Sequence, residues 1–452
     1  MSASPRADGL SVDRSAAYSK STVTMFAVAI FVWAVDFKAE GSGSAAAFQA
    51  ILLGVYLVVF LSTAVSATKA GTGIGSVWVL VLAVAAFLVD SAMIGLSRNQ
   101  NPYAIFVNLI PPFVYASASV LTYITLSIGK DRLPTILTVL RLACLAYAVG
   151  RVGITFALRG IDVAHSRYEV LSGAVTPALG ILALALVRRI SRLDVVIMIF
   201  NLAVTVLSVT RTLFVVLAAQ LASVFVARPT GLLKSTTLKG IALLAISGVA
   251  IAAVDYAAGT GLIERWAGRL LVGGRMGADP TALTRSAETH FMMESFTAST
   301  DTLLFGNGLA AVTSLTGPDA RLAAQLVGWA SVNIHDVGYG HQSYASILFV
   351  AGLLGGGALV FMQVLNALQA IAMIRRLQLA GTAYEDTVAH VGAWGAFIVI
   401  GIATYGLLGA VIGDRSTCVW YGVGTGMLYW AREVLQAPKR LPAMVPRVQI
   451  PK

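Results

Sequence analysis

The chain has 452 residues, of which 57% are hydrophobic and only 12% are charged, whereas soluble proteins carry about 25% charged residues. Too few charges remain to cover a soluble globule, and the composition also excludes a disordered chain, a coiled coil and a disulfide scaffold. The net charge of +11 is therefore attributed to membrane topology, and no nucleic-acid partner is predicted. The sequence predicts an all-α, multi-pass protein whose solvent is the lipid bilayer.

Twelve apolar runs are candidates for membrane-spanning helices, which need about 20 apolar residues each. They cover roughly residues 21–36, 44–66, 76–96, 103–127, 134–158, 170–187, 195–210, 212–227, 240–258, 342–374, 387–411 and 417–431. The chain then divides into a tail (1–20), helices one to nine (21–258), one large loop (259–340), helices ten to twelve (341–431) and a second tail (432–452). Both cysteines, Cys144 and Cys418, lie within these apolar runs, so neither a disulfide nor a cysteine-based zinc site is predicted.

Lysine and arginine are distributed unequally between the two sides of this arrangement. With both termini in the cytoplasm, the cytoplasmic segments hold nineteen basic residues and the short outer loops hold five: Lys38, Arg98, Arg159, Arg167 and Arg415. Basic residues accumulate on the cytoplasmic side of membrane proteins. The sequence therefore predicts cytoplasmic termini and a loop at 259–340 on the outer side of the membrane.

This loop is the longest polar segment of the chain, at about 82 residues, and loops of such length are usually functional. Leu262–Val272 is predicted to form an interfacial helix with Trp266 as its anchor. Residues 283–298 are predicted to form a second helix, and Phe305–Gly308 reads Phe-Gly-Asn-Gly, which predicts a turn.

Charged residues at membrane depth are costly and each needs a reason. Asp90 and Arg151 reach similar depths in their runs and are predicted to form an ion pair, which is either structural or part of a site. Arg141 is expected to extend toward the cytoplasm. Arg211 begins a run at the outer face, where it either binds lipid headgroups or presents a guanidinium to an anion, with Asp255 to orient it.

A histidine stands at the junction between the large loop and the tenth run. His341 is predicted to begin this helix, where the positive end of the helix dipole disfavours the imidazolium and leaves a neutral ring able to accept a proton. The alternative is a capping or interface histidine, and His335 and His290 are alternates for the base. His335 with Asp336 has no metal-ligand spacing, so no metal site is predicted. Within the loop, Arg285 and Glu288 have the spacing of a solvated i,i+3 pair.

Three motifs in this order resemble the O-antigen ligase and polymerase superfamily of bacterial polysaccharide assembly. They are the Ser-x-x-Arg sequence Ser208–Arg211, the loop arginine Arg285 followed by the Gly-x-Gly turn, and His341-Gln342 leading into the Gly-Leu-Leu-Gly sequence Gly352–Gly355. The likeness covers roughly residues 195–360. Gln342 stands where the family more often has asparagine, and the aromatic residue that follows the loop arginine in the family is not evident here.

The resemblance implies glycan transfer from an undecaprenyl-diphosphate carrier to a sugar acceptor, with neither metal nor nucleotide cofactor. By this resemblance Arg211 and Arg285 bind the diphosphate, and His341 activates the acceptor hydroxyl. We place Gln342, Glu288 and Tyr344 beside them as substrate-binding residues.

Three functions remain open at this point. A polymerase that joins lipid-linked repeat units is the leading hypothesis, with a flippase and a chain-length regulator as its expected partners. An O-antigen ligase that transfers finished polymer to lipid A-core is the alternative within the family. A transporter of lipid-linked glycan is a third, although transporters place charged sites near the bilayer midplane, whereas the candidate residues here gather at the outer face.

Overall fold

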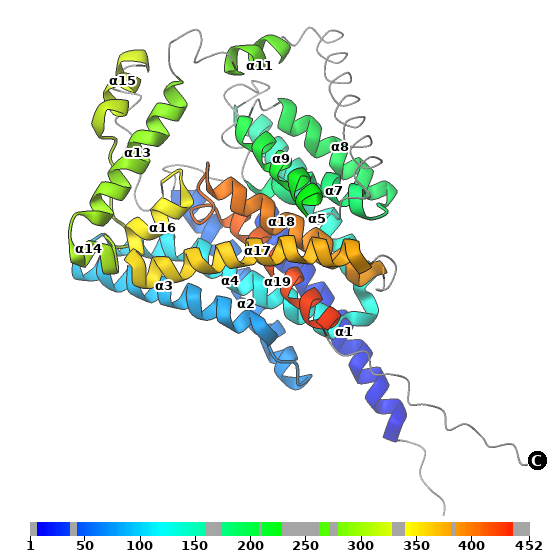
Figure 1. Ribbon diagram of the computed structural model, residues 1–452. Helices are drawn as coiled ribbons and strands as arrows, with labels where there is room; N and C mark the ends of the chain where they lie inside the picture. Colours follow the sequence, from blue (N-terminus) through cyan, green and yellow to red (C-terminus); the bar gives the residue numbers. More distant parts are fainter. Residues whose placement is uncertain are drawn as a thin grey trace, which may run out of the picture.

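The computed structural model describes residues 7–36, 43–159, 173–207, 210–227, 262–270, 279–327, 340–380 and 386–436. Within these ranges the chain folds into helices, and no strand is present (Figure 1). Six described helical segments are long and apolar enough to cross a membrane: Ala47–Lys69, Gly75–Ser97, Pro102–Ile128, Lys130–Gly150, Ser343–Leu379 and Asp386–Gly406. The predicted all-α membrane protein is thereby confirmed, while the number of twelve spans stays a prediction.

Every predicted apolar run within the described residues coincides with one or more helices. These are α1 (Ala7–Val32), α2 (Gly43–Lys69), α3 (Trp78–Ser97), α4 (Pro102–Ile128), α5 (Leu133–Arg159), α7 (Thr176–Val187), α8 (Arg192–Leu207), α9 (Arg211–Val226), α16 (Ser343–Ala351), α17 (Gly357–Ala380), α18 (Asp386–Gly406) and α19 (Arg415–Gln436). The ninth run, 240–258, lies outside the described residues.

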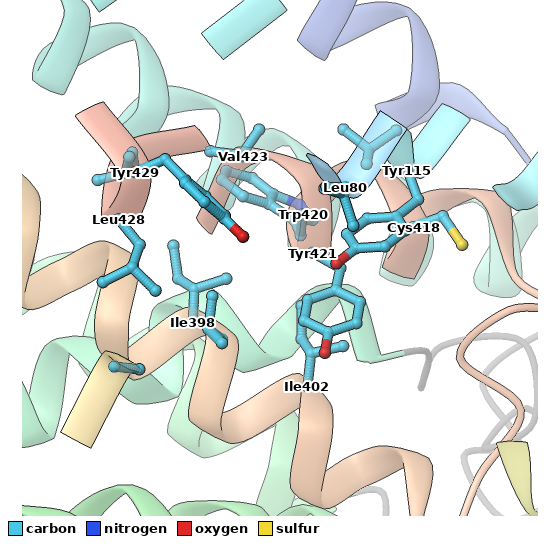
Figure 2. Close-up of a cluster of buried hydrophobic side chains, with 14 of the residues drawn as sticks. Leu80, Tyr115, Ile398, Ile402, Cys418, Trp420, Tyr421, Val423, Leu428 and Tyr429 are labelled. Atoms are coloured by element: carbon cyan, nitrogen blue, oxygen red, sulfur yellow. The ribbon is translucent and has the colours of Figure 1, made fainter. Parts of the chain in front are cut away.

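The core lies where α4, α18 and α19 pack together. Figure 2 shows Tyr421 of α19 beside Tyr115 of α4, with Ile398 and Ile402 of α18 facing them. The two tyrosine rings are stacked, with centroids 4.6 Å apart. In the apolar stretch of α18, 89% of the residues are buried within the protein, whereas 22% are buried in the apolar stretch of α2. Since α2 is apolar yet exposed, it belongs to the lipid-facing rim.

The predicted large loop contains four described helices. They are α11 (Leu262–Leu270), α13 (Pro280–Thr297), α14 (Thr300–Phe305) and α15 (Gly317–Val327). Both helices predicted in this region are confirmed. The indole N–H of Trp266 in α11 donates to the carbonyl of Val206 at 3.0 Å and its ring packs on Phe214, while its role as an interfacial anchor stays a prediction. Trp266 therefore attaches α11 to α8 and α9.

The tenth run differs from the single helix expected, because it breaks at Gly352 between α16 and α17. Gly352 has φ +57°, and residues 352–356 form a π-helical turn, η6. The break leaves the last carbonyls of α16 without partners in their own helix. The predicted turn at 305–308 supplies the missing hydrogen-bond donors. The N–H groups of Asn307 and Gly308 donate to the carbonyls of Phe349 and Val350 at 2.7 and 2.9 Å.

This contact attaches the segment containing α13 and α14 to the membrane bundle. The side chain of Gln100, between α3 and α4, bonds the Asn307 carbonyl at 2.7 Å and the N–H of Ala310 at 2.9 Å. The N–H of Leu309 donates to the carbonyl of Ser91 in α3 at 3.1 Å. As a result the segment containing α13 and α14 is held by α3, α16 and the loop between α3 and α4 (Figure 1).

Gly352→Ala is expected to destabilise the protein strongly. A Cβ at this position would lie 2.3 Å from the carbonyl oxygen of Leu304, and the backbone conformation alone costs a non-glycine residue about 1–3 kcal/mol. Thermal melting of the detergent-solubilised protein, followed by size-exclusion chromatography, measures this loss. Gly54→Ala is the matched control, because nothing lies within 4 Å of the added Cβ. Equal melting temperatures for the two variants would contradict the role given to Gly352.

Arg141 forms a bidentate ion pair with the buried carboxylate of Asp194, at 2.6 Å (Nε) and 2.9 Å (Nη2). Asp194 lies in the first turn of α8, and the extension of Arg141 toward the cytoplasm stays a prediction. The same guanidinium lies 3.3 Å from Nε2 of His390. Asp194 also accepts hydrogen bonds from the N–H and hydroxyl of Ser191. The arginine therefore joins α5 to α8 and α18, since a buried charge is stable only when paired and hydrogen-bonded.

Asp90 contacts the broken helix. Its carboxylate lies beside η6, where a Cβ added to Gly355 would be 2.8 Å from Oδ2. The glycine is therefore required for this close approach of α3. The predicted partner, Arg151, has a side chain outside the described residues.

Candidate functional site

The most polar arrangement near the predicted outer face joins α13 to the start of α16. Nδ1 of His341 lies 3.1 Å from Oε2 of Glu288, and the backbone N–H of His341 donates to the same oxygen at 2.9 Å. Glu288 is 4% exposed, whereas 53% of the His341 side chain is exposed. A buried carboxylate thus holds an accessible imidazole.

The segment before α16 is shaped to allow this contact. Gly340 lies directly over the carboxylate, since an added Cβ would be 2.7 Å from Oε1 of Glu288. Its N–H donates to the hydroxyl of Ser346 at 2.9 Å, and that hydroxyl donates to the carbonyl of Gln342 at 2.9 Å. These bonds fix the backbone on both sides of His341. Any larger residue at position 340 would displace the glutamate.

Helix α13 presents the other half of the site. Asp279 caps its N-terminus by accepting the N–H of Thr281 at 3.0 Å, and Pro280 occupies the first turn. Glu288 lies on the buried face of this helix with Ala287. Ala287 packs against three alanines of α15, Ala320, Ala323 and Ala324. The glutamate is therefore positioned by a packed helix rather than by a flexible loop.

An open pocket of about 520 Å³ lies between α13, the start of α16 and the residues that follow α18. It is lined by Arg285, Ser286, Thr289, His290, Met293, His341, Gln342, Leu407 and Leu408. Arg285 supplies a guanidinium and the two leucines supply an apolar wall. The pocket therefore suits a ligand with both an anionic and an apolar part.

Arg211 does not line this pocket. It is the first residue of α9 and forms an ion pair with Asp279, the residue that caps the N-terminus of α13. Asp279 precedes Arg285 by six residues, or about 9 Å along the helix. The structure thus brings the two predicted arginines to one helix, about two turns apart, with Asp279 as the carboxylate beside Arg211.

Two of the predicted substrate-binding residues have contacts within the protein. Gln342 lines the pocket, but its Oε1 accepts the N–H of Ala345 at 2.6 Å and caps α16. The hydroxyl of Tyr344 donates to the carbonyl of Ala403 at 2.8 Å, and Tyr344 is not among the residues that line the pocket. Tyr344 therefore joins α16 to α18. The predicted start of a helix at this point is confirmed, because α16 begins at Ser343 with Gln342 as its N-cap.

Of the other candidates, His290 lines the same pocket and the rest fall outside the described residues. His290 is exposed and lies 3.8 Å from Glu294, one turn along α13. Asp255, His335 and Asp336 lie outside the described residues. Among the described residues no group of three or more histidine, cysteine or acidic side chains is placed to hold a metal ion.

Some site residues were missed from the sequence. Asp279-Pro280 is an N-cap signal that places the start of α13 three residues before the predicted one. Gly340 carries no signal of its own, because its role depends on Glu288 from another helix. Leu407 and Leu408 lay within a predicted span, whereas α18 ends at Gly406.

Comparison with known proteins finds neither a protein-family model nor a curated protein that matches this chain.

Proposed function

We propose that the protein is a polysaccharide polymerase that joins undecaprenyl-diphosphate-linked repeat units. The observation that supports this most is the pocket in which Arg285, His341 and the two leucines meet. A lipid-linked donor has an anionic diphosphate between an apolar chain and a sugar. The three kinds of side chain match these parts in one place, at the end of a membrane-spanning helix.

The donor is the only activated sugar that the proposed location allows. Nucleotide sugars are absent outside the cytoplasmic membrane, so a carrier already linked to the glycan must supply the glycosyl group. Arg285 binds its diphosphate from the pocket wall, and Arg211 approaches from the N-terminus of α13. Guanidinium groups match phosphate oxygens in a bidentate manner, and they stabilise the negative charge that develops on the leaving diphosphate.

His341 acts as the general base on the acceptor sugar. The acceptor hydroxyl oxygen forms a bond to the anomeric carbon of the donor, and the bond from that carbon to the diphosphate oxygen breaks. The electron pair of that bond leaves with undecaprenyl diphosphate, while the hydroxyl proton passes to the imidazole and then to solvent. A single displacement of this kind inverts the anomeric carbon.

The proposal includes a topology of twelve spans in the bacterial inner membrane, with cytoplasmic termini and a periplasmic 259–340 segment. The nineteen-to-five distribution of basic residues supports it. A contact within the protein agrees: Arg98, at the end of α3, pairs with Asp301 of α14 at 2.7 Å. The short loop after α3 and the 259–340 segment therefore lie on one side.

A reporter enzyme that is active only outside the cytoplasm tests this topology. Fused after Thr316 it is expected to be active, and fused after Leu379 it is expected to be silent, because one membrane span, Ser343–Leu379, should separate the two positions. Immunoblots of both fusions control for expression. An active fusion at Leu379 with a silent one at Thr316 would place the pocket in the cytoplasm and refute the proposed donor.

The ligase alternative is separated from the polymerase by what accumulates when the gene is deleted. Loss of a polymerase leaves single repeat units on the lipid carrier and on lipid A-core, because transfer to the core still operates. Loss of a ligase leaves complete polymer on the carrier and an empty core. Mass spectrometry of extracted lipid-linked glycans measures both, and a plasmid copy of the gene is the control.

A further inference from the structure

We infer that Glu288 is a positioning residue that orients the His341 imidazole and stabilises its protonated form, rather than a residue that binds substrate. The inference rests on the proposed function for its catalytic meaning. Its structural part, the pairing of a buried carboxylate with an accessible histidine, stands on the geometry alone.

One oxygen of Glu288 accepts both hydrogen bonds from His341. Oε2 lies 2.9 Å from the backbone nitrogen and 3.1 Å from Nδ1. A carboxylate accepts hydrogen bonds only, so the ring must carry its hydrogen on Nδ1. In the neutral ring the lone pair then lies on Nε2. This nitrogen is the one that takes the acceptor proton.

Burial decides between positioning and substrate binding. Glu288 is 4% exposed and Gly340 covers its other oxygen, so a ligand in the pocket meets His341 rather than the carboxylate. A negative charge in direct contact with a diphosphate would also repel it. Behind the ring, by contrast, the same charge stabilises the imidazolium that forms as the proton arrives, as carboxylates do behind other catalytic histidines.

Among the described residues, the other titratable groups that line this pocket with His341 come from α13. Arg285 and His290 line the same pocket, and His290 pairs with Glu294. Glu294 offers a matched comparison, because it lies on the same helix and beside a histidine, yet it is exposed and outside the pocket lining. The two glutamates therefore differ in burial and in the histidine they contact.

The test compares Glu288→Gln with Glu294→Gln in the full-length protein reconstituted in liposomes. Glutamine keeps the volume and an oxygen able to accept both hydrogen bonds, but it removes the charge. We expect Glu288→Gln to lower kcat about 100-fold while the donor KM changes less than threefold. The acid limb of its pH–rate profile should move to lower pH, because a neighbouring carboxylate favours a protonated imidazole. Glu294→Gln should match the wild type in all three measurements.

Two results would overturn the inference. An unchanged kcat and pH profile in Glu288→Gln would make Glu288 a structural residue only. A raised donor KM with unchanged kcat would restore it to substrate binding. Melting temperature and membrane yield show whether Glu288→Gln is folded; if it is not, Glu288→Asp, which retracts the charge by one methylene, should show the same pattern of kcat and KM.

A measurement without turnover separates this inference from the proposed reaction. Nitrogen-15 spectra of the histidine side chains, with His341 assigned by its loss in His341→Ala, report which ring nitrogen carries hydrogen. We expect Nδ1–H in the neutral ring of the wild type and a changed signal in Glu288→Gln. Hydrogen on Nε2 would refute the pairing. If the wild type makes no product, the proposed function fails, and these spectra still decide the role of Glu288.

Discussion

Replacing His341 by alanine is expected to lower the rate of glycan transfer by about 10²–10⁴-fold, the range that a general base supplies. The backbone N–H that donates to Glu288 remains in this variant, and the lost side chain is half exposed, so the fold should persist. Donor affinity should stay close to wild type, because the arginines rather than the histidine bind the diphosphate. Product formation and binding of fluorescent donor to purified protein measure the two quantities.

His290→Ala is the control for this experiment. It removes the same side chain from the same pocket, but His290 contacts the exposed Glu294 rather than a buried carboxylate. We expect it to retain activity within about tenfold of wild type. Full activity in His341→Ala would reduce His341 to a residue of the helix start, and loss in His290→Ala alone would move the base to α13.

Arg211→Lys is expected to lower kcat/KM for the donor by about 10–100-fold although the charge is kept. Lysine cannot form the bidentate contact to phosphate oxygens, and a hydrogen bond between charged groups is worth about 1.5–3 kcal/mol. Initial rates over a range of donor concentrations measure the effect. Membrane yield should not change, because lysine can still pair with Asp279.

Asp279→Asn distinguishes donor binding from the ion pair seen in the structure. Asparagine still caps α13 but removes the charge next to Arg211. If Arg211 binds the donor, this variant should retain most activity. If Arg211 serves only to hold α13, Asp279→Asn should be more damaging than Arg211→Lys, which keeps the pair, and the role of Arg211 in donor binding would be refuted.

The helices could be predicted because long apolar runs are visible in composition alone. The break at Gly352 could not, because it depends on Asn307 and Gly308 reaching the carbonyls of α16. The glycines of 352–357 read equally well as a close-packed helix. The partner of Arg141 could not be predicted for the same reason: Asp194 lies on α8, and a single sequence does not show which helices adjoin.

For the candidate site, the sequence indicated which residues lie together better than it indicated their contacts. Arg285 and His341 do line one pocket, which the order of motifs around the long loop indicated. Glu288 was expected to be solvated or to bind substrate, yet it is buried behind His341, because Gly340 and His341 at the start of α16 cover its carboxylate. Burial of a single acidic residue has no signature in local sequence.

Purified protein in liposomes, with a lipid-linked oligosaccharide as donor and EDTA in the buffer, tests the proposed function directly. We predict longer lipid-linked glycans and one undecaprenyl diphosphate released for each linkage formed, with no need for lipid A-core. No product, together with movement of intact donor across the bilayer, would identify a transporter and refute the polymerase.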